Sequence, residues 1–260
     1  DSNVIEGNFI GTDPTGTLDR GNGNDGIFIF NNSQFNTIGG TTPAARNLIS
    51  GNDRIGILIF GSNVSNNFVQ GNFIGTNAAG TGPLDNSHQG IEVGNSPNNT
   101  IGGTVLGARN VVSSNGSVSA DSDGINIYGA TATGNLVQGN FVGTNVTGTA
   151  ALGNATEGVS VGQGASNNTI GGTAPGARNI ISGNLRSGVS LYNGATLNKV
   201  EGNFIGTDIN GAAALGNGGV GITVNSGSTN NSIGGTVSSA RNVISSNGSV
   251  NNDDDGININ

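Results

Sequence analysis

The sequence contains no cysteine, and this absence excludes a disulfide framework, thiol chemistry and a cysteine-ligated zinc site. Positive charge is also scarce, with one lysine and seven arginines among 260 residues and a formal net charge of −8. Because nucleic-acid binding needs clustered basic side chains to meet phosphates, we expect no nucleic-acid partner. No stretch approaches the run of about 18 apolar residues that crosses a bilayer, so we expect no transmembrane segment.

The chain is rich instead in glycine, with 49 residues, and in a recurring phrase of Asn, any residue and then Ile or Val. The phrase returns at steps of 31, 32, 36, 33, 30 and 33 residues, and a period in this range is typical of solenoids. We expect the asparagine amides to stack as a structural ladder at the turns between strands, where asparagine also tolerates left-handed backbone. The predicted ladder residues are Asn36, Asn67, Asn99, Asn135, Asn168, Asn198 and Asn231.

Each coil is predicted to carry three short parallel strands. The first strand opens on glycine and alternates with period two, at residues 26–29, 56–59, 90–93, 124–127, 158–161, 188–191 and 221–224. The recurring asparagine phrase is the second strand, and a further Asn-led phrase, such as residues 47–49, is the third. Seven coils supply 28 inward-facing positions, of which 27 are Ile or Val and Leu191 is the exception. Such β-branched side chains suit a narrow stacked core.

Each coil also carries one insert. In alternate coils it lies between the second and third strands and ends on a repeated arginine, whose guanidinium we expect to tie insert carbonyls together; these are Arg46, Arg109, Arg178 and Arg241. In the other coils the insert follows the third strand. The outward positions of the third strands form an apolar stripe that we expect these inserts to cover, and it runs through Phe9, Leu48, Phe73, Val111, Phe141, Ile180, Phe204 and Val243.

The order Gly-Ile-x-Ile, Asn-x-Ile, Asn-x-Ile resembles the right-handed parallel β-helix of the pectate-lyase-like superfamily. The phrases at residues 7–13 and 38–47 are similar to repeats of large secreted or surface-attached bacterial proteins. The prediction is therefore an all-β fold, a right-handed parallel β-helix solenoid with three short strands per coil and about eight coils of 30–35 residues. The resemblance implies an extracellular or cell-surface location. Fold alone does not assign an activity.

A longer period relates the two halves of the chain. Residues 113–117 and 123–127 recur 132 positions later as residues 245–249 and 255–259. We therefore expect a single uncapped β-helix segment over residues 1–260, with two 132-residue units of four coils each, roughly 1–128 and 133–260. Open strand edges at both ends favour pairing with flanking repeats of the same parent chain or with further copies end to end.

The catalytic candidates are Asp123, Glu157 and His88. The two carboxylates precede coil-opening glycines of adjacent coils, which would place them about 4.8 Å apart, and His88 lies one coil earlier beside Gln89. Paired carboxylates perform glycoside hydrolysis. However, we expect no Arg or Lys to join this pair, and the Gly-His-Gly and Arg-Ile-Lys phrases of polygalacturonase-like members are missing. We therefore expect a protein that is not an enzyme.

Two other features are candidate binding sites. The acidic residues Asp121, Asp123, Asp253 and Asp255 provide oxygen ligands of the kind that calcium takes, and calcium is the one cofactor that the composition suggests. The outward side chains of the first strands near the N-terminus form an apolar patch that could contact a protein or a glycan, and it consists of Phe28, Phe30, Leu58 and Phe60.

The expected function is architectural, as a filament, surface-layer component or adhesin stalk that extends by coil-on-coil stacking. Two alternatives remain. One is a polysaccharide-acting enzyme that works through Asp123 and Glu157, and the other is a carbohydrate- or protein-binding module that uses the Phe28/Phe60 patch.

Overall fold

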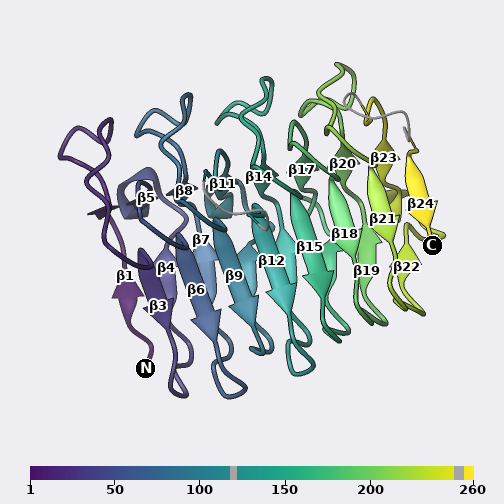
Figure 1. Cartoon of the computed structure of the whole chain (residues 1–260), viewed down its shortest axis with the longest axis horizontal. Helices are drawn as coiled ribbons and strands as arrows, with labels where there is room; N and C mark the ends of the chain where they lie inside the picture. The colour runs from purple at the N-terminus through teal and green to yellow at the C-terminus, as the bar shows by residue number, and fades with distance from the viewer. Residues whose placement is uncertain (118–121, 249–254) are drawn as a thin grey trace.

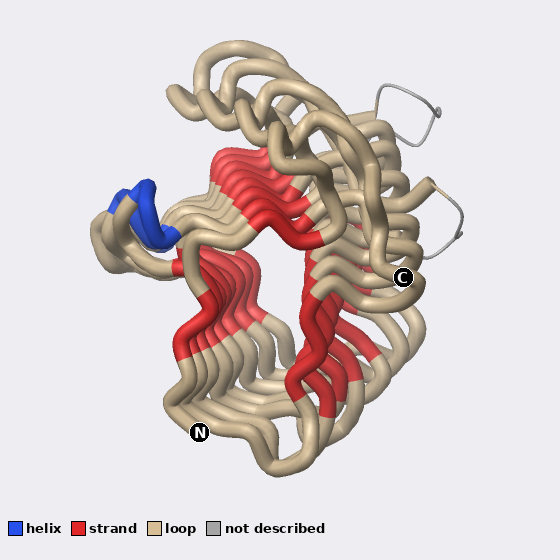
Figure 2. The backbone as a smooth tube through the Cα atoms, turned by 90° about the vertical axis from the view of Figure 1, so that its left-hand side faces the viewer, coloured by secondary structure: helices blue, strands red, loops and turns tan. Residues whose placement is uncertain are grey.

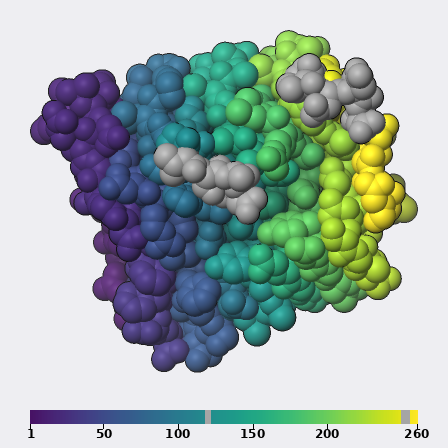
Figure 3. Space-filling model, viewed as in Figure 1, coloured from purple at the N-terminus to yellow at the C-terminus, as the bar shows by residue number. Residues whose placement is uncertain are grey.

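The computed structural model describes residues 1–117, 122–248 and 255–260. It is an all-β parallel solenoid, as predicted, in which three eight-stranded parallel sheets surround one interior (Figures 1 and 2). The chain visits the three sheets in turn and then begins the next coil. Each sheet therefore contains seven coil-to-coil steps. In the space-filling view the coils follow one another in sequence order from the N-terminal to the C-terminal end (Figure 3).

The first sheet is formed by the coil-opening strands. They are β3 (Ile27–Ile29), β6 (Ile57–Phe60), β9 (Ile91–Gly94), β12 (Ile125–Tyr128), β15 (Val159–Gly162), β18 (Val189–Leu191), β21 (Ile222–Val224) and β24 (Ile257–Ile259). Every neighbouring pair is parallel and in register, as where Ile125 pairs with Val159 and Ile127 with Val161.

The second sheet contains the strands of the recurring asparagine phrase. They are β1 (Val4–Ile5), β4 (Thr37–Gly39), β7 (Phe68–Gln70), β10 (Thr100–Gly102), β13 (Leu136–Gln138), β16 (Thr169–Gly171), β19 (Lys199–Glu201) and β22 (Ser232–Ile233). The third sheet is made of two-residue strands. They are β2 (Phe9–Ile10), β5 (Leu48–Ile49), β8 (Phe73–Ile74), β11 (Val111–Val112), β14 (Phe141–Val142), β17 (Ile180–Ile181), β20 (Phe204–Ile205) and β23 (Val243–Ile244).

The core is the stack of inward Ile and Val side chains that the period-two alternation predicts. All 28 predicted positions belong to one cluster, and among these positions only Ile233 and Ile244, near the C-terminal end, are partly rather than fully buried; Ile5 and Ile10 of the first coil are also partly buried against it. Most of the interior positions are completely inaccessible to solvent. Each coil alone buries too little apolar surface to fold, so the hydrophobic gain depends on the neighbouring coils.

Three asparagine ladders run the length of the described chain. The predicted ladder is confirmed: the Nδ2 of each rung donates to the Oδ1 of the next at 2.9–3.3 Å, and Asn3 adds an earlier rung. A second ladder precedes the third strands and contains Asn8, Asn47, Asn72, Asn110, Asn140, Asn179, Asn203 and Asn242. The third ladder, which the sequence analysis missed, contains Asn22, Asn52, Asn86, Asn115, Asn154, Asn184, Asn217 and Asn247.

The expectation of left-handed backbone was wrong for the ladder residues and holds for the residues just before them. The position that precedes each rung of the predicted ladder has a positive φ in every coil, as at Asn66, Asn98 and Asn167. Two coils place a bulky residue there, Phe35 and Leu197, each with φ of 58°. The ladder asparagines themselves are not among the residues with positive φ, and their backbone N–H groups also donate to the next rung.

The apolar stripe of the third strands is covered by inserts between Leu48 and Phe204, as predicted, but Phe9 at the first coil is 48% exposed and Val243 at the last is only partly buried. Leu48, Val111 and the rings of Phe73 and Phe141 are buried against insert residues such as Val146. The covering inserts are short antiparallel loops, closed by bridges such as that between Thr76 and Pro83, and they form the upper loops of Figure 1. Three of the four other inserts contain a 3₁₀ turn, drawn blue in Figure 2: η1 (Pro43–Ala45), η2 (Leu106–Ala108) and η3 (Ser238–Ala240).

Three of the four repeated arginines link one coil to the next, in a contact that we call the Arg–Phe clasp. The guanidinium of Arg109 lies 4.0 Å above the ring centre of Phe141, and its Nε donates to the carbonyl of Gly139 at 3.1 Å. Arg46 and Arg178 make the same two contacts with the coil that follows them. A structural role was predicted, but the acceptor is a glycine carbonyl of the following coil rather than the carbonyls of the insert.

Within the described residues, no helix has the length and apolar character that crossing a bilayer requires.

Candidate functional site

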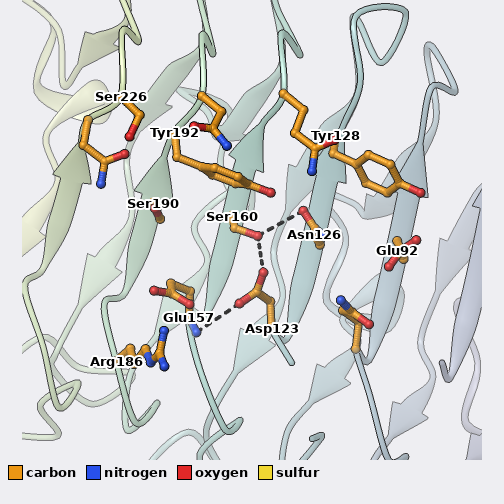
Figure 4. A pocket seen from close by; sticks show the side chains of 14 residues that line it. Glu92, Asp123, Asn126, Tyr128, Glu157, Ser160, Arg186, Ser190, Tyr192 and Ser226 are labelled. Carbon is orange, nitrogen blue, oxygen red and sulfur yellow. Dashed lines mark hydrogen bonds between the residues drawn. The ribbon is translucent and has the colours of Figure 1, made fainter. Parts of the chain in front are cut away.

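A polar groove of about 650 Å³ lies on the outer face of the first sheet, across strands β9, β12, β15 and β18 (Figure 4). The strands present their alternate, outward-facing residues here, because the inward ones are committed to the core. The side chains that matter chemically are those of Glu92, Asp123, Tyr128, Glu157, Ser160, Arg186 and Tyr192. The groove therefore contains both carboxylates that the sequence analysis singled out.

Asp123 is held by three donors. Its Oδ1 accepts from the hydroxyl of Thr156 at 2.6 Å and from the backbone N–H of Glu157 at 3.1 Å. Its Oδ2 accepts from the hydroxyl of Ser160 (Figure 4). The Asp123 side chain is only 6% exposed, so these bonds replace most of its solvation. The carboxyl group is thus fixed in place by the following coil.

Glu157 is the neighbour of Asp123 in the next coil, and burial raises its pKa to about 7. The negative charge of Asp123 and a hydrogen bond from protonated Glu157 to that carboxylate contribute to this rise in the same direction as burial. The carboxyl of Glu157 therefore holds its proton up to near neutral pH. The prediction that these carboxylates lie one coil apart is correct.

The expectation that no basic residue joins the pair was wrong. Arg186 lies beside Glu157 at the lower edge of the groove (Figure 4), and its positive charge lowers the pKa of Glu157, against the larger effects of burial and Asp123. At the equivalent positions one unit earlier, Arg54 forms an ion pair with Asp25 at 3.4 Å. The two pairs stand 132 residues apart in the sequence. The offset relates Arg186 to Arg54, but it does not show which carboxylate either arginine meets.

The two tyrosines of the chain lie on the groove wall, two coils apart. The hydroxyl of Tyr128 donates to the carboxylate of Glu92, and burial and this negative charge raise the pKa of the phenol. Burial also raises the pKa of Glu92, and the bond from Tyr128 opposes that rise. A β-carbon at Gly162 would clash with the ring of Tyr192, so this glycine lets the ring lie against the sheet. The sequence analysis missed both tyrosines, although each directly follows the alternating part of a first strand.

His88 is not among the residues that line the groove, although its neighbour Gln89 is. The backbone N–H of His88 donates to the carbonyl of Arg54, and its side chain is half-buried. The imidazole therefore does not complete a catalytic group with Asp123 and Glu157 within this groove.

The calcium candidates are only partly described. Asp121 and Asp253 lie outside the described residues. Asp123 is occupied by the donors named above, and Asp255 is exposed and accepts from Asn258 at 3.0 Å. Within the described parts of the chain, no group of three acidic or histidine side chains converges as a metal site. Calcium binding at these positions stays a prediction.

The apolar patch is partly as predicted. Phe28, Phe30 and Phe60 are each more than 40% exposed, and the rings of Phe28 and Phe30 stack with centroids 4.5 Å apart. They border a shallow hollow of about 380 Å³. Leu58 does not belong to the exposed patch, because it is 7% exposed between Phe28 on one side and Glu92 on the other.

The arrangement of the two carboxyls in the groove differs from that of a glycosidase. A glycosidase holds its two carboxyls about 5–10 Å apart so that a sugar or a water fits between them. Asp123 and Glu157 instead bond to each other, and Asp123 is further occupied by Thr156 and Ser160. What remains accessible is a line of hydroxyl, amide and guanidinium groups beside two aromatic rings.

In comparisons with known proteins, no family model, no curated protein and no solved structure matches the chain.

Proposed function

We propose that this chain is an architectural element of an extracellular or cell-surface assembly, such as a filament, surface layer or adhesin stalk. The rod extends by coil-on-coil stacking from one repeat unit to the next. The sequence resemblance to repeats of large secreted bacterial proteins and to the right-handed parallel β-helix supports this location. The scarcity of charge and the regular use of nearly every buried position for stacking support a structural role.

The observation that carries this proposal is the continuity of the three asparagine ladders across the boundary between the 132-residue units. Asn99 in the first unit donates to Asn135 in the second in the same manner as rungs within a unit. The sheets also cross this boundary without interruption, as β10 pairs with β13 in register. A structure that passes from unit to unit in this way can be lengthened by adding units.

A tandem fusion tests the proposal. Two copies of residues 1–260 are joined by Gly-Ala-Thr-Ala, the residues of positions 129–132 that the 132-residue offset places between successive copies. Eight coils at about 4.8 Å give a rod of roughly 40 Å, so the fusion should be a single straight rod of roughly 80 Å in electron micrographs. Two shorter rods hinged at the joint would contradict the proposal.

A second candidate function is carbohydrate binding in the groove, which the two tyrosine rings and the surrounding polar groups favour. Aromatic faces pack against sugar rings while amide and hydroxyl groups meet the sugar hydroxyls. A glycan array probed with the isolated monomer tests it, with Tyr192→Ala as the variant that should lose binding and Phe60→Ser as a control outside the groove. If the groove instead acts on a polysaccharide, Asp123→Asn should abolish the activity.

A further inference from the structure

The fourth repeated arginine lacks its partners within the described chain. Arg241 follows the 3₁₀ turn η3 just as Arg109 follows η2, yet no aromatic ring and no glycine carbonyl of the described residues meets its guanidinium. It is exposed and lines a hollow of about 470 Å³ together with Ile233, Ile244 and Ile257. Within the rod, the corresponding space is filled by the next coil.

The missing half of this clasp is present at the other end of the chain. The 132-residue offset relates Phe141 to Phe9 and Gly139 to Gly7. Phe9 is 48% exposed, whereas Phe141, which carries Arg109 on its ring, is 1% exposed. The first coil thus offers the ring and the carbonyl that Arg241 lacks.

The ladders at the two ends are complementary in the same sense. Each rung donates from Nδ2 and from its backbone N–H to the Oδ1 of the rung that follows it. The last described rungs, Asn231, Asn242 and Asn247, therefore present donors, and the first rungs, Asn3, Asn8 and Asn22, present Oδ1 acceptors. Because donors gather at one end and acceptors at the other, head-to-tail contact between two copies pairs one set with the other.

The exposed apolar side chains of the last coil point to the same partner. Ile257 and Ile259 are 43% and 73% exposed, although the equivalent residues Ile125 and Ile127 are completely buried. What buries Ile125 and Ile127 within the rod is the following strand β15, which pairs with β12 in register. The 132-residue offset makes β3 the equivalent of β15, so the first coil is a matching cover for the last.

We propose that two copies of this chain associate head to tail, with Arg241 of one copy clasped on Phe9 and Gly7 of the next. This inference rests on the proposed architectural function and names its contact. The register follows from the internal pairs: Ser232 faces Val4, Val243 faces Phe9, and Ile257 faces Ile27. The interface is heterologous and leaves one donor face and one acceptor face free, so addition continues into a fibre.

Engineered cysteines test this register, because the chain has none of its own. Val4 and Ser232 are both exposed and lie in the first and last strands of the second sheet. In the proposed contact their Cα atoms are about 4.8 Å apart, within the range of about 4.4–6.8 Å that a disulfide spans. The double variant V4C/S232C should form covalent multimers under mild oxidation, seen as a ladder of bands on a non-reducing gel.

Two matched variants control this experiment. Lys199 pairs with Ser232 within one chain, so K199C/S232C should form an internal disulfide and no multimers, which shows that this geometry permits a bond. V4C/K199C should remain reduced, because Lys199 lies one coil away from the proposed contact. Equal multimer formation by V4C/K199C and V4C/S232C would overturn the register.

Arg241→Ala tests the clasp without any cysteine. It should weaken self-association about 10- to 100-fold in analytical ultracentrifugation, as loss of a cation–π contact and a hydrogen bond predicts. Phe9→Ala should have a similar effect, and the double variant should be little worse than either single one. Arg186→Ala removes the same charge from the middle of the rod and should leave association unchanged. Undiminished association of the Arg241→Ala variant would overturn the clasp.

The outcomes separate this inference from the proposed function. If the tandem fusion is one straight rod while V4C/S232C yields no multimers and the control disulfide forms, the self-association is wrong and the architectural role stands. If the two halves of the fusion hinge independently while V4C/S232C forms multimers, the chains associate but unit-to-unit continuation within one chain is wrong.

Discussion

Asn140 donates two hydrogen bonds to a single oxygen of Asn179, one from its backbone N–H at 2.9 Å and one from its Nδ2 at 3.2 Å. Asn179 in turn donates to Val137 and to the next rung, Asn203. Both asparagines are completely buried. Each rung is thus bound to coils on both sides, and no other uncharged side chain of this length offers an acceptor and two donors in one plane.

Replacing Asn179 with alanine should lower the free energy of unfolding by about 3–5 kcal/mol, because it leaves buried donors and a carbonyl without partners. Urea denaturation monitored by circular dichroism measures the change. Asn242→Ala is the matched control at the last coil, where the rung is only partly buried. Its effect should be clearly smaller, and equal effects at the two positions would show that the ladder does not act through burial.

Replacing Arg109 with alanine should lower the free energy of unfolding by about 1–3 kcal/mol, because it removes the contact with the Phe141 ring and the hydrogen bond to the carbonyl of Gly139. Arg109→Lys should recover only part of this loss, because an ammonium cannot lie flat on the ring. Thermal and urea unfolding of the dilute protein measure the stability changes of both variants. Arg241→Ala is the control, and in the monomer it should change stability by less than about 0.5 kcal/mol.

Glu157 should make the protein less stable as the pH rises. Its carboxyl has a pKa of about 7 in the folded chain, against the ordinary glutamate value of 4.5 in the unfolded chain, so well below pH 4.5 it is protonated in both states. Between these values the unfolded chain releases the proton first, and stability falls; above pH 7 the penalty is constant. The free energy of unfolding of the Glu157→Gln variant should therefore equal that of the parent protein at pH 4 and exceed it by about 1–3 kcal/mol at pH 8.

The neighbouring arginine provides a second variant for the same effect. Because Arg186 lowers the pKa of Glu157, Arg186→Ala should raise that pKa and extend the fall in stability to higher pH. Unfolding curves at several pH values are the measurement. If the curves of Glu157→Gln and the parent stay parallel across this range, Glu157 is not protonated near neutral pH.

Leu197→Asn should stabilise the protein. Leu197 has φ of 58° and is 52% exposed, so it bears the strain of a left-handed backbone and buries little in return. Asparagine occupies the equivalent position in several other coils, and the change should gain about 0.5–1.5 kcal/mol. The reverse substitution, Asn167→Leu, should cost a similar amount. A loss of stability in Leu197→Asn would mean that the leucine packs usefully in solution.

The candidate groove shows where prediction from the sequence stopped. Asp123 and Glu157 share a column that the coil period reveals, so their proximity followed from counting residues. Arg186 escaped notice because it belongs to the loop before β18, and only the pairing of coils shows that it meets Glu157. Leu58 was expected to be exposed as an outward residue, yet its neighbours Phe28 and Glu92 cover it.

The sequence by itself determined the solenoid, the three strands per coil, the inward Ile and Val positions and the predicted asparagine ladder, because each is a local pattern repeated at a fixed period. Only the tertiary structure decided which side chains of different coils touch. The clasp of Arg109 on Phe141 and the raised pKa of Glu157 beside Asp123 depend on the lateral placement of loops and rotamers. Such placement is set by packing between coils, and a one-dimensional period does not contain it.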